Sequence, residues 1–164
     1  MKNRRGLLKV LAMMLVIGFL ISSCSKTDKK LDGTWTGVKD GMNYEYILKN
    51  GKYECSYDGI VGEKGTFTTK DGVITWDMKE VHGSIVNLMF GVQVVESKWY
   101  SKNEFITAFK TALTTSFGLS DSDINPLLDP LVSPPPYNYT VDDKALVMTY
   151  EMYGEKNIDT FTKK

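Results

Sequence analysis

The chain of 164 residues contains a single histidine, His82, and lacks the short motifs around which common catalytic sites are built. There is no Gly-x-Ser-x-Gly elbow, no pairing of cysteine with histidine and no glycine-rich phosphate loop. His82 precedes Gly83 in an expected turn, where a lone histidine is usually a solvated loop residue. We therefore expect no catalytic residue, no metal site and no cofactor, and we predict that the protein is not an enzyme.

Excess positive charge is also lacking once residues 1–23 are set aside. Those residues hold four of the 20 basic side chains and none of the 20 acidic ones, which leaves 16 basic against 20 acidic residues and a formal charge of about −4. A nucleic-acid-binding domain needs a basic patch or stripe, and this remainder offers no such field. We expect no nucleic acid among the partners.

A calcium loop is excluded by geometry, although residues 121–125 repeat the spacing of the first EF-hand ligands. Pro126 stands where that loop requires glycine, and Val132 stands where it requires a bidentate glutamate. Helix capping by Ser120 or Ser122 explains the polar residues better.

Cysteine is scarce, and one of only two cysteines, Cys24, closes an apolar run from Leu11 to Ile21. A cluster of four positive charges precedes the run, and two serines stand directly before the cysteine. These are the parts of a secretory signal. The run is too short for a permanent membrane helix, which needs roughly 20 apolar residues. We predict a removable signal peptide over residues 1–23.

The segment Ile21-Ser22-Ser23-Cys24 resembles the lipobox of bacterial lipoproteins. The resemblance implies that the Cys24 sulfur is lipidated and that cleavage follows Ser23. Two or three long acyl chains hold a protein on a bilayer almost irreversibly. Because Ser25 brings no acidic retention signal, we expect an anchor in the outer membrane of the cell envelope. The alternative is an ordinary signal peptide cut near Ser23, with an incidental cysteine.

The 141 residues that remain suit one domain. Residues 24–30 would be the lipidated cysteine and a polar tether, and residues 31–164 the folded domain. With Cys24 lipidated, Cys55 has no partner for an intrachain disulfide. Its neighbours at spacing two are tyrosines, so we expect Cys55 to be buried on the apolar face of a strand.

Short aromatic and β-branched runs separated by turn residues follow one another from about Leu31 to Lys79, which predicts strands. Asn50-Gly51 and Asp71-Gly72 lie between adjacent runs and suit the positive φ angles of type I′ hairpins, so successive strands should pair antiparallel. The five predicted strands are 34–38, 44–49, 52–58, 65–70 and 73–79.

The next segment, 85–100, is strand-like in composition but interrupted at Gly91, and it predicts one kinked strand or two short ones. Prolines at five positions between 126 and 136 predict short turns at best. Strand patterns then return at 137–141, 145–153 and 157–162.

Between these segments the apolar period changes to four residues, behind a tetrapeptide that begins with Ser101 and ends with Glu104. The two residues fit a capping box, which marks the start of a helix. We predict an amphipathic helix over about 102–117, ended by Gly118.

Eight or nine short antiparallel strands with one helical insertion predict an all-β protein, a meander closed into a barrel. The segment Leu31-Asp32-Gly33-Thr34-Trp35-Thr36-Gly37 resembles the Gly-x-Trp opening of lipocalins. Gly65-Thr66-Phe67 with Asp71 to Thr75, and the end of the chain from Tyr139, resemble the middle and last strands of bacterial lipocalin-like lipoproteins. The resemblance implies a lipocalin-like barrel in which Trp35 packs across the closed end. The region from about Gly91 to Pro136 departs from the family's simplest form.

An eight-stranded barrel has just enough volume to be filled by side chains or to hold one small ligand. Its predicted inward positions are aromatic or methionine, which suits either a core or a cavity for an apolar ligand. They are Tyr44, Tyr46, Tyr53, Tyr57, Trp76, Met78, Met148, Tyr150 and Met152. The 102–117 helix is expected as a lid over the open end, or as a plug that fills the barrel with Phe105, Phe109 and Phe117.

Two functions fit this architecture. The first is an envelope-anchored carrier or receptor for a small apolar ligand, which requires an empty barrel. The alternative is a solid-barrel interaction or inhibitor module at the cell surface, which binds an envelope or host protein through an exposed patch such as one near residues 134–137. Fold alone does not choose between them.

Overall fold

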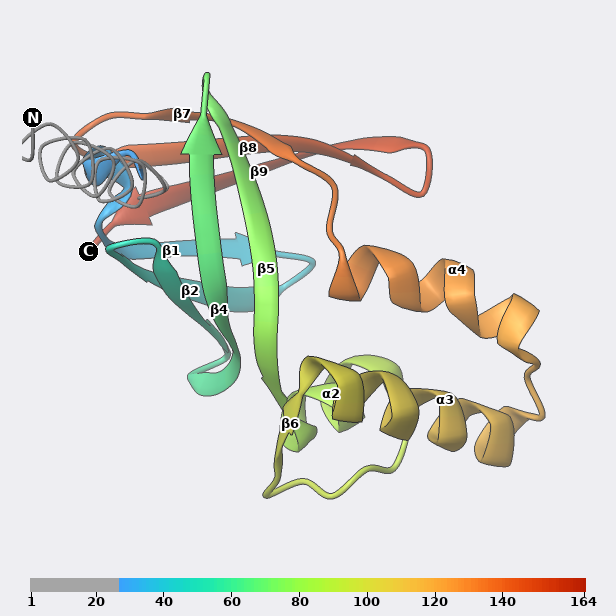
Figure 1. Ribbon diagram of the computed structural model, residues 1–164. Coiled ribbons are helices and arrows are strands. Elements are labelled where there is room, and N and C mark those ends of the chain that lie inside the picture. The colour runs from blue at the N-terminus through green and yellow to red at the C-terminus, as the bar shows by residue number, and fades with distance from the viewer. Residues whose placement is uncertain (1–26) are drawn as a thin grey trace, which may run out of the picture.

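Eight antiparallel strands close into a barrel in the computed structural model, which describes residues 27–164 (Figure 1). Neighbouring strands follow the order β4-β3-β2-β1-β9-β8-β7-β5, and β4 also pairs with β5, which closes the ring. A ninth strand, β6, pairs with β5. The strands are β1 (Gly33–Lys39), β2 (Met42–Lys49), β3 (Lys52–Tyr57), β4 (Ile60–Lys70), β5 (Val73–His82), β6 (Trp99–Ser101), β7 (Tyr137–Val141), β8 (Ala145–Met152) and β9 (Glu155–Lys163). The predicted all-β barrel with a helical insertion is confirmed.

The signal peptide and the lipidated Cys24 predicted from the sequence lie outside the described residues. Within residues 27–164, no helix has the length and the apolar character needed to cross a bilayer. Every strand ladder joins residues from Gly33 onward, so a chain that begins at Ser25 contains all the pairings of the barrel.

Tight turns connect the hairpins as the sequence predicts. Asn50-Gly51 and Asp71-Gly72 have positive φ angles at both positions (51° and 75°, 52° and 77°), as type I′ turns require. The same pair of positive angles recurs at three further hairpins, whose turns are Asp40-Gly41, Asp58-Gly59 and Tyr153-Gly154.

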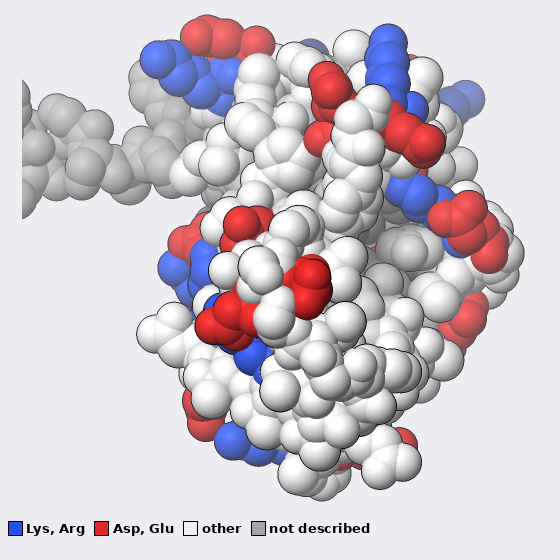
Figure 2. Space-filling view, turned by 90° about the vertical axis from the view of Figure 1, so that its right-hand side faces the viewer, with Lys and Arg blue, Asp and Glu red and all other residues white. Residues whose placement is uncertain are grey.

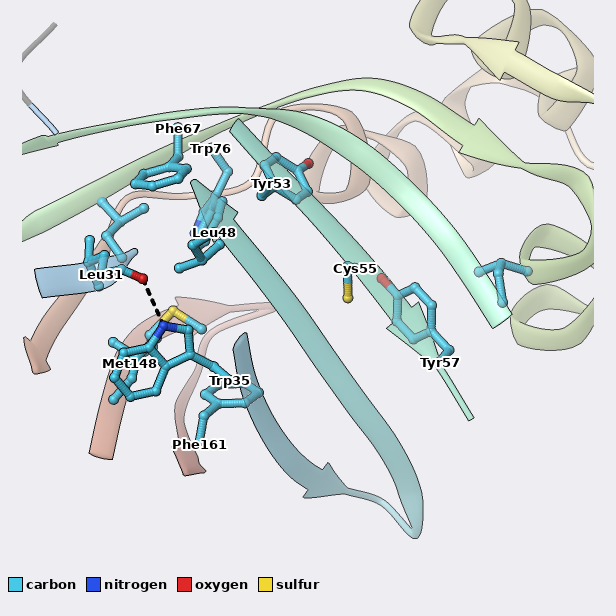
Figure 3. Packing of buried hydrophobic residues seen from close by; sticks show 13 residues of the cluster. Leu31, Trp35, Leu48, Tyr53, Cys55, Tyr57, Phe67, Trp76, Met148 and Phe161 are labelled. Atoms are coloured by element: carbon cyan, nitrogen blue, oxygen red, sulfur yellow. Dashed lines mark hydrogen bonds between the residues drawn. The ribbon is translucent and has the colours of Figure 1, made fainter. Parts of the chain in front are cut away.

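One end of the barrel is filled with side chains (Figure 3). The 3₁₀-helix η1 (Lys29–Leu31) lies at this end, where the indole Nε1 of Trp35 donates a hydrogen bond of 2.8 Å to the Leu31 carbonyl. Both residues are completely buried. The C-terminal end of the chain also lies on this side in Figure 1, and we call it the closed end.

The helical insertion between β5 and β7 holds three α-helices rather than the single one predicted. They are α2 (Gly83–Phe90), α3 (Lys102–Phe117) and α4 (Asp121–Val132). Helix α3 has the predicted bounds, and its capping box joins Ser101 and Glu104. Ser120 caps α4 in the same way, which confirms the capping interpretation of that segment.

The strand predicted over 85–100 is wrong for all but its last two residues: 85–90 belong to α2, 91–98 form a loop, and only Trp99 and Tyr100 lie in a strand, β6. Strand-like composition is overruled in α2 by packing, because the helix buries two adjacent residues, Ile85 and Val86, in two different clusters. The turns predicted from the prolines are also wrong for 121–132. In α4 the four-residue spacing of Ile124, Leu128 and Val132 buries one continuous face. The stabilisation from this burial outweighs the cost of the backbone hydrogen bonds that its two internal prolines cannot donate.

Most of the buried apolar side chains of the helices pack against the far end of β5 rather than inside the barrel. Phe105 and Phe109 belong to a second cluster of buried residues, which also contains Met78, Val81 and Tyr100. We call it the helical cluster. Phe117 is 59% exposed. Helix α3 is therefore not a plug.

Candidate functional site

A cavity of about 600 Å³ lies inside the barrel. All eight barrel strands contribute to its walls, and Trp76 and Phe161 belong both to these walls and to the buried cluster of the barrel. Helix residues Met89, Pro130 and Leu131 also line it. The covering elements are therefore α2 and α4, whereas the sequence analysis considered only the 102–117 helix. Figure 2 views the side of the molecule that carries the helices: its lower part is largely uncharged, and charges of both signs lie above.

Seven of the nine inward residues predicted from the sequence line this cavity. They are Tyr44, Tyr46, Tyr53, Tyr57, Trp76, Tyr150 and Met152. The other two are core residues: Met78 belongs to the helical cluster, and Met148 is buried at the closed end of the barrel.

The aromatic rings of the cavity contact one another mainly by their edges. The Tyr44 and Tyr57 ring centroids are 5.0 Å apart at 71°, and those of Tyr53 and Trp76 are 5.1 Å apart at 81°. Such edge-to-face pairs are favoured by the ring quadrupoles. They give the wall a defined shape, and they leave the phenol hydroxyls available for hydrogen bonds.

Glu63, on β4, lines the cavity among these tyrosines, and the sequence analysis did not identify it. The Tyr53 hydroxyl donates to its Oε1, and the Tyr57 hydroxyl donates to its Oε2 at 3.3 Å. Burial raises the pKa of this carboxyl above its ordinary value, and the two phenol hydrogen bonds oppose the rise. A detectable signal existed: Phe67, Gly65 and Glu63 share one face of a strand if the alternation is followed back beyond the predicted start.

The backbone around Glu63 is adapted to hold it in place. The β3–β4 register shifts at Cys55 and Ser56, and the β4–β5 register shifts at Lys64 and Gly65, so irregular pairings flank Glu63 on both sides. A Cβ on Gly65 would lie 2.5 Å from the Tyr53 ring and 2.4 Å from a backbone oxygen of β5. Only glycine allows Tyr53 to lie across β4 and reach the carboxylate.

A second polar group lines the cavity from β1, β8 and β9. Lys39 Nζ lies 3.1 Å from Asp159 Oδ1 and donates to the Tyr150 hydroxyl. The Tyr150 ring stacks on Tyr137 at 4.0 Å and 7°. The only lysine on the cavity wall thus already has a carboxylate partner among the described residues.

Cys55 is completely buried, as expected, with Tyr53 and Tyr57 on the same strand. Burial raises the pKa of its thiol to about 12, and the nearby Glu63 charge contributes to the rise. Such a buried thiol is a core group in the protonated form at neutral pH.

His82 is the last residue of β5 rather than a solvated turn residue, which corrects the expectation. It is half-buried, and its ring meets Trp99 edge-on at 5.0 Å. Within the part of the chain that the structure describes, no group of three His, Cys, Asp or Glu side chains could hold a metal ion.

Comparison with known proteins found no matching family model, no similar curated protein and no similar solved structure. The closed eight-stranded antiparallel barrel is compatible with a lipocalin-like fold, and the resemblance rests on this architecture alone.

Proposed function

We propose that this protein is a lipid-anchored carrier or receptor of the cell envelope, and not an enzyme, whose lipocalin-like barrel binds a small ligand with a large apolar or aromatic part. The cavity carries this proposal. Its volume of about 600 Å³ falls within the range of small-molecule sites, and its wall combines aromatic rings with a few placed polar groups.

The cavity favours a carrier over a solid-barrel interaction module. The phenyl groups of Phe105 and Phe109 pack in the helical cluster and leave the barrel interior free. The proline segment considered as an exposed patch also faces the cavity, since Pro134 and Tyr137 both line it. A patch turned inward is a poor surface for a protein partner.

Native mass spectrometry of the chain from Ser25 onward, purified from cells without detergent, tests the carrier function. We expect a stoichiometric small molecule that leaves on denaturation, or uptake of the neutral apolar probe N-phenyl-1-naphthylamine. The variant Asn157→Trp should abolish uptake, because Asn157 lines the cavity. Lys156→Trp is the control, since Lys156 is exposed on the same strand. Absence of any bound molecule and of probe uptake would contradict the proposal.

The anchor rests on the sequence alone and needs its own test. We expect radiolabelled palmitate to be incorporated into the full chain in bacteria and to co-sediment with outer membranes. Cys24→Ser should lose the label, and Cys55→Ser should keep it. An unlabelled full chain would show an ordinary secretory signal.

A further inference from the structure

Glu63 is a carboxylate inside an aromatic cavity without a cationic partner in the protein. None of the ion pairs formed among residues 27–164 includes it. Its two phenol partners, Tyr53 and Tyr57, are neutral donors. An ionised carboxylate accepts about four hydrogen bonds, so acceptor capacity remains. The side chain is only partly exposed, and a carboxylate in such a place is stabilised in its ionised form by a cationic partner.

The lysine on the cavity wall does not supply the missing partner. Lys39 Nζ is bonded to Asp159 at 3.1 Å and to the Tyr150 hydroxyl. Three acidic residues, Asp40, Glu63 and Asp159, line the cavity against one lysine, so its wall carries more negative than positive charge. An anionic ligand such as a fatty acid would therefore meet repulsion near Glu63.

The rings around Glu63 suit a cation. Glu63 pairs with Cys55 on β3, and Cys55 pairs with Tyr46 on β2, so Tyr46 lies in the same row across the sheet. Tyr44 contacts the ring of Tyr57. Aromatic faces attract ammonium groups, and this attraction grows where water is excluded.

We propose that the ligand of this cavity carries a primary ammonium group on an apolar or aromatic body, and that the ammonium binds beside Glu63. The inference rests on the proposed function and narrows its ligand class. The carboxylate accepts from the ammonium N–H groups through its free lone pairs, the surrounding tyrosine rings face the cation, and the apolar body fills the rest of the cavity. A primary ammonium is favoured over a quaternary one because it has hydrogens to donate.

Three probes of nearly equal size and different charge test this assignment: phenethylammonium, 2-phenylethanol and phenylacetate. Their affinities for the chain from Ser25 onward are measured by isothermal titration calorimetry at pH 7.5. We expect phenethylammonium to bind about tenfold or more tightly than 2-phenylethanol, since a desolvated cation–aromatic contact and a charged hydrogen bond each contribute on this scale. Phenylacetate should bind more weakly than either.

Two glutamine variants complete the experiment. Glu63→Gln keeps the side-chain shape. It should make the affinities for phenethylammonium and 2-phenylethanol about equal, while the affinity for 2-phenylethanol itself is preserved. Glu54→Gln removes the same charge from the partly exposed Glu54 of β3, which pairs with Lys64, and should leave the preference unchanged. Melting curves establish that both variants fold.

Equal affinities for the amine and the alcohol in the unmodified protein would overturn the inference and leave the proposed function standing. The same holds if Glu63→Gln keeps the preference. Binding of none of the three probes overturns the inference as well, and uptake of the neutral naphthylamine probe then decides the proposed function separately.

Discussion

The two hydrophobic clusters of this protein are built from different kinds of side chain. The barrel cluster is rich in tyrosine, whereas Tyr100 is the only tyrosine among the buried residues of the helical cluster in the described chain. The Tyr100 hydroxyl serves structure, since it accepts from the Val95 amide at 3.0 Å. Aliphatic and phenyl groups can fill space with no polar requirement, while phenols need partners for their hydroxyls. The contrast fits the proposed function, in which the helical cluster contributes stability and the barrel interior would bind the ligand.

The largest expected effect is a loss of stability without a loss of ligand binding, on substitution of Phe109 in the helical cluster. Phe109 is 1% exposed and packs against Phe90 and Phe105 at 4.9 and 5.3 Å. Phe109→Ala should lower the free energy of unfolding by about 3–5 kcal/mol, measured by urea denaturation, and leave probe uptake by the folded protein unchanged. The exposed Phe117 of the same helix is the control, since Phe117→Ala should change stability by less than about 0.5 kcal/mol. Loss of uptake in folded Phe109→Ala would show that the clusters are not separate.

A smaller effect is expected on the barrel side, at Gly65. The added methyl of Gly65→Ala must displace the Tyr53 ring or the β5 backbone. We expect a loss of about 1–3 kcal/mol in the free energy of unfolding, together with weaker probe binding, because Tyr53 moves away from Glu63. Thr66→Ala, at the next residue, is the control. Unchanged binding would mean that Tyr53 does not shape the cavity.

The pH dependence of stability tests Glu63 itself. Its folded-state pKa is raised above the ordinary value of 4.5, so the folded protein holds this proton at pH values where the unfolded chain has released it. The free energy of unfolding should therefore fall as pH rises from about 4.5 through the raised pKa, by at most about 1.4 kcal/mol for each pH unit from this group. Glu63→Gln should remove this component, and Glu54→Gln should retain it. Identical profiles for the unmodified protein and Glu63→Gln would contradict the pKa direction.

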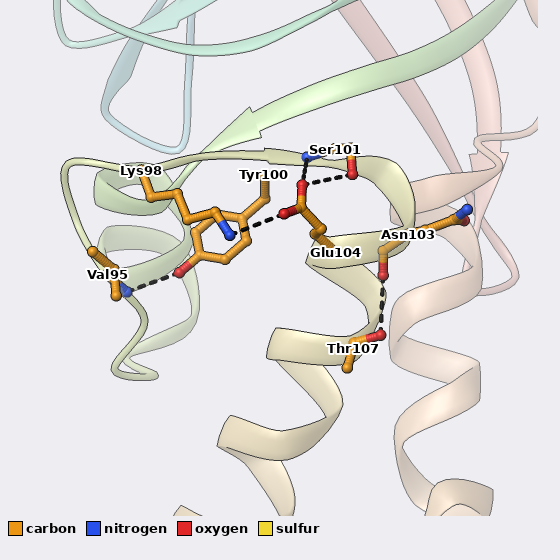
Figure 4. Close-up of polar contacts among 7 residues, drawn as sticks. All are labelled: Val95, Lys98, Tyr100, Ser101, Asn103, Glu104 and Thr107. Carbon is orange, nitrogen blue, oxygen red and sulfur yellow. Dashed lines mark hydrogen bonds and ion pairs between the residues drawn. The ribbon is translucent and has the colours of Figure 1, made fainter.

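The smallest effect concerns the start of α3 (Figure 4). The Ser101 amide and hydroxyl both donate to Glu104 Oε2, at 3.0 and 2.7 Å, and Lys98 contacts Oε1. These bonds lower the pKa of Glu104 to about 2. Ser101→Ala should reduce the free energy of unfolding by about 1 kcal/mol and raise the Glu104 pKa, as read by NMR titration. Ser116→Ala, at an exposed position of the same helix, should do neither.

The barrel was largely predictable from the sequence because its signals are local. Asn-Gly and Asp-Gly pairs fix tight turns, and two-residue alternation fixes which face of each strand points inward. The strand predicted at 137–141 has the bounds that the structure gives it, and the capping box predicts both ends of α3 when combined with Gly118.

The rest of the insertion was not predictable in this way because long-range packing decides it. Residues 85–90 have strand-like composition, and α4 contains Pro126 and Pro130, so local preferences oppose both helices. The candidate site shows the same division. Seven cavity residues follow from alternation. Glu63 lies before the predicted start of its strand, next to a register shift that the sequence does not show, and only the alternation back from Phe67 indicates it.

The position of η1 at the closed end would also orient the protein on a membrane if Cys24 carries the proposed lipid. Only four residues lie between Cys24 and Lys29, and the five steps from one to the other span at most roughly 18 Å. A lipid on Cys24 would therefore hold the closed end toward the bilayer and turn the cavity, with α2 and α4 over it, toward the aqueous side. Cargo would then be exchanged with the surrounding water or with a second macromolecule, and not drawn directly from the lipid beneath.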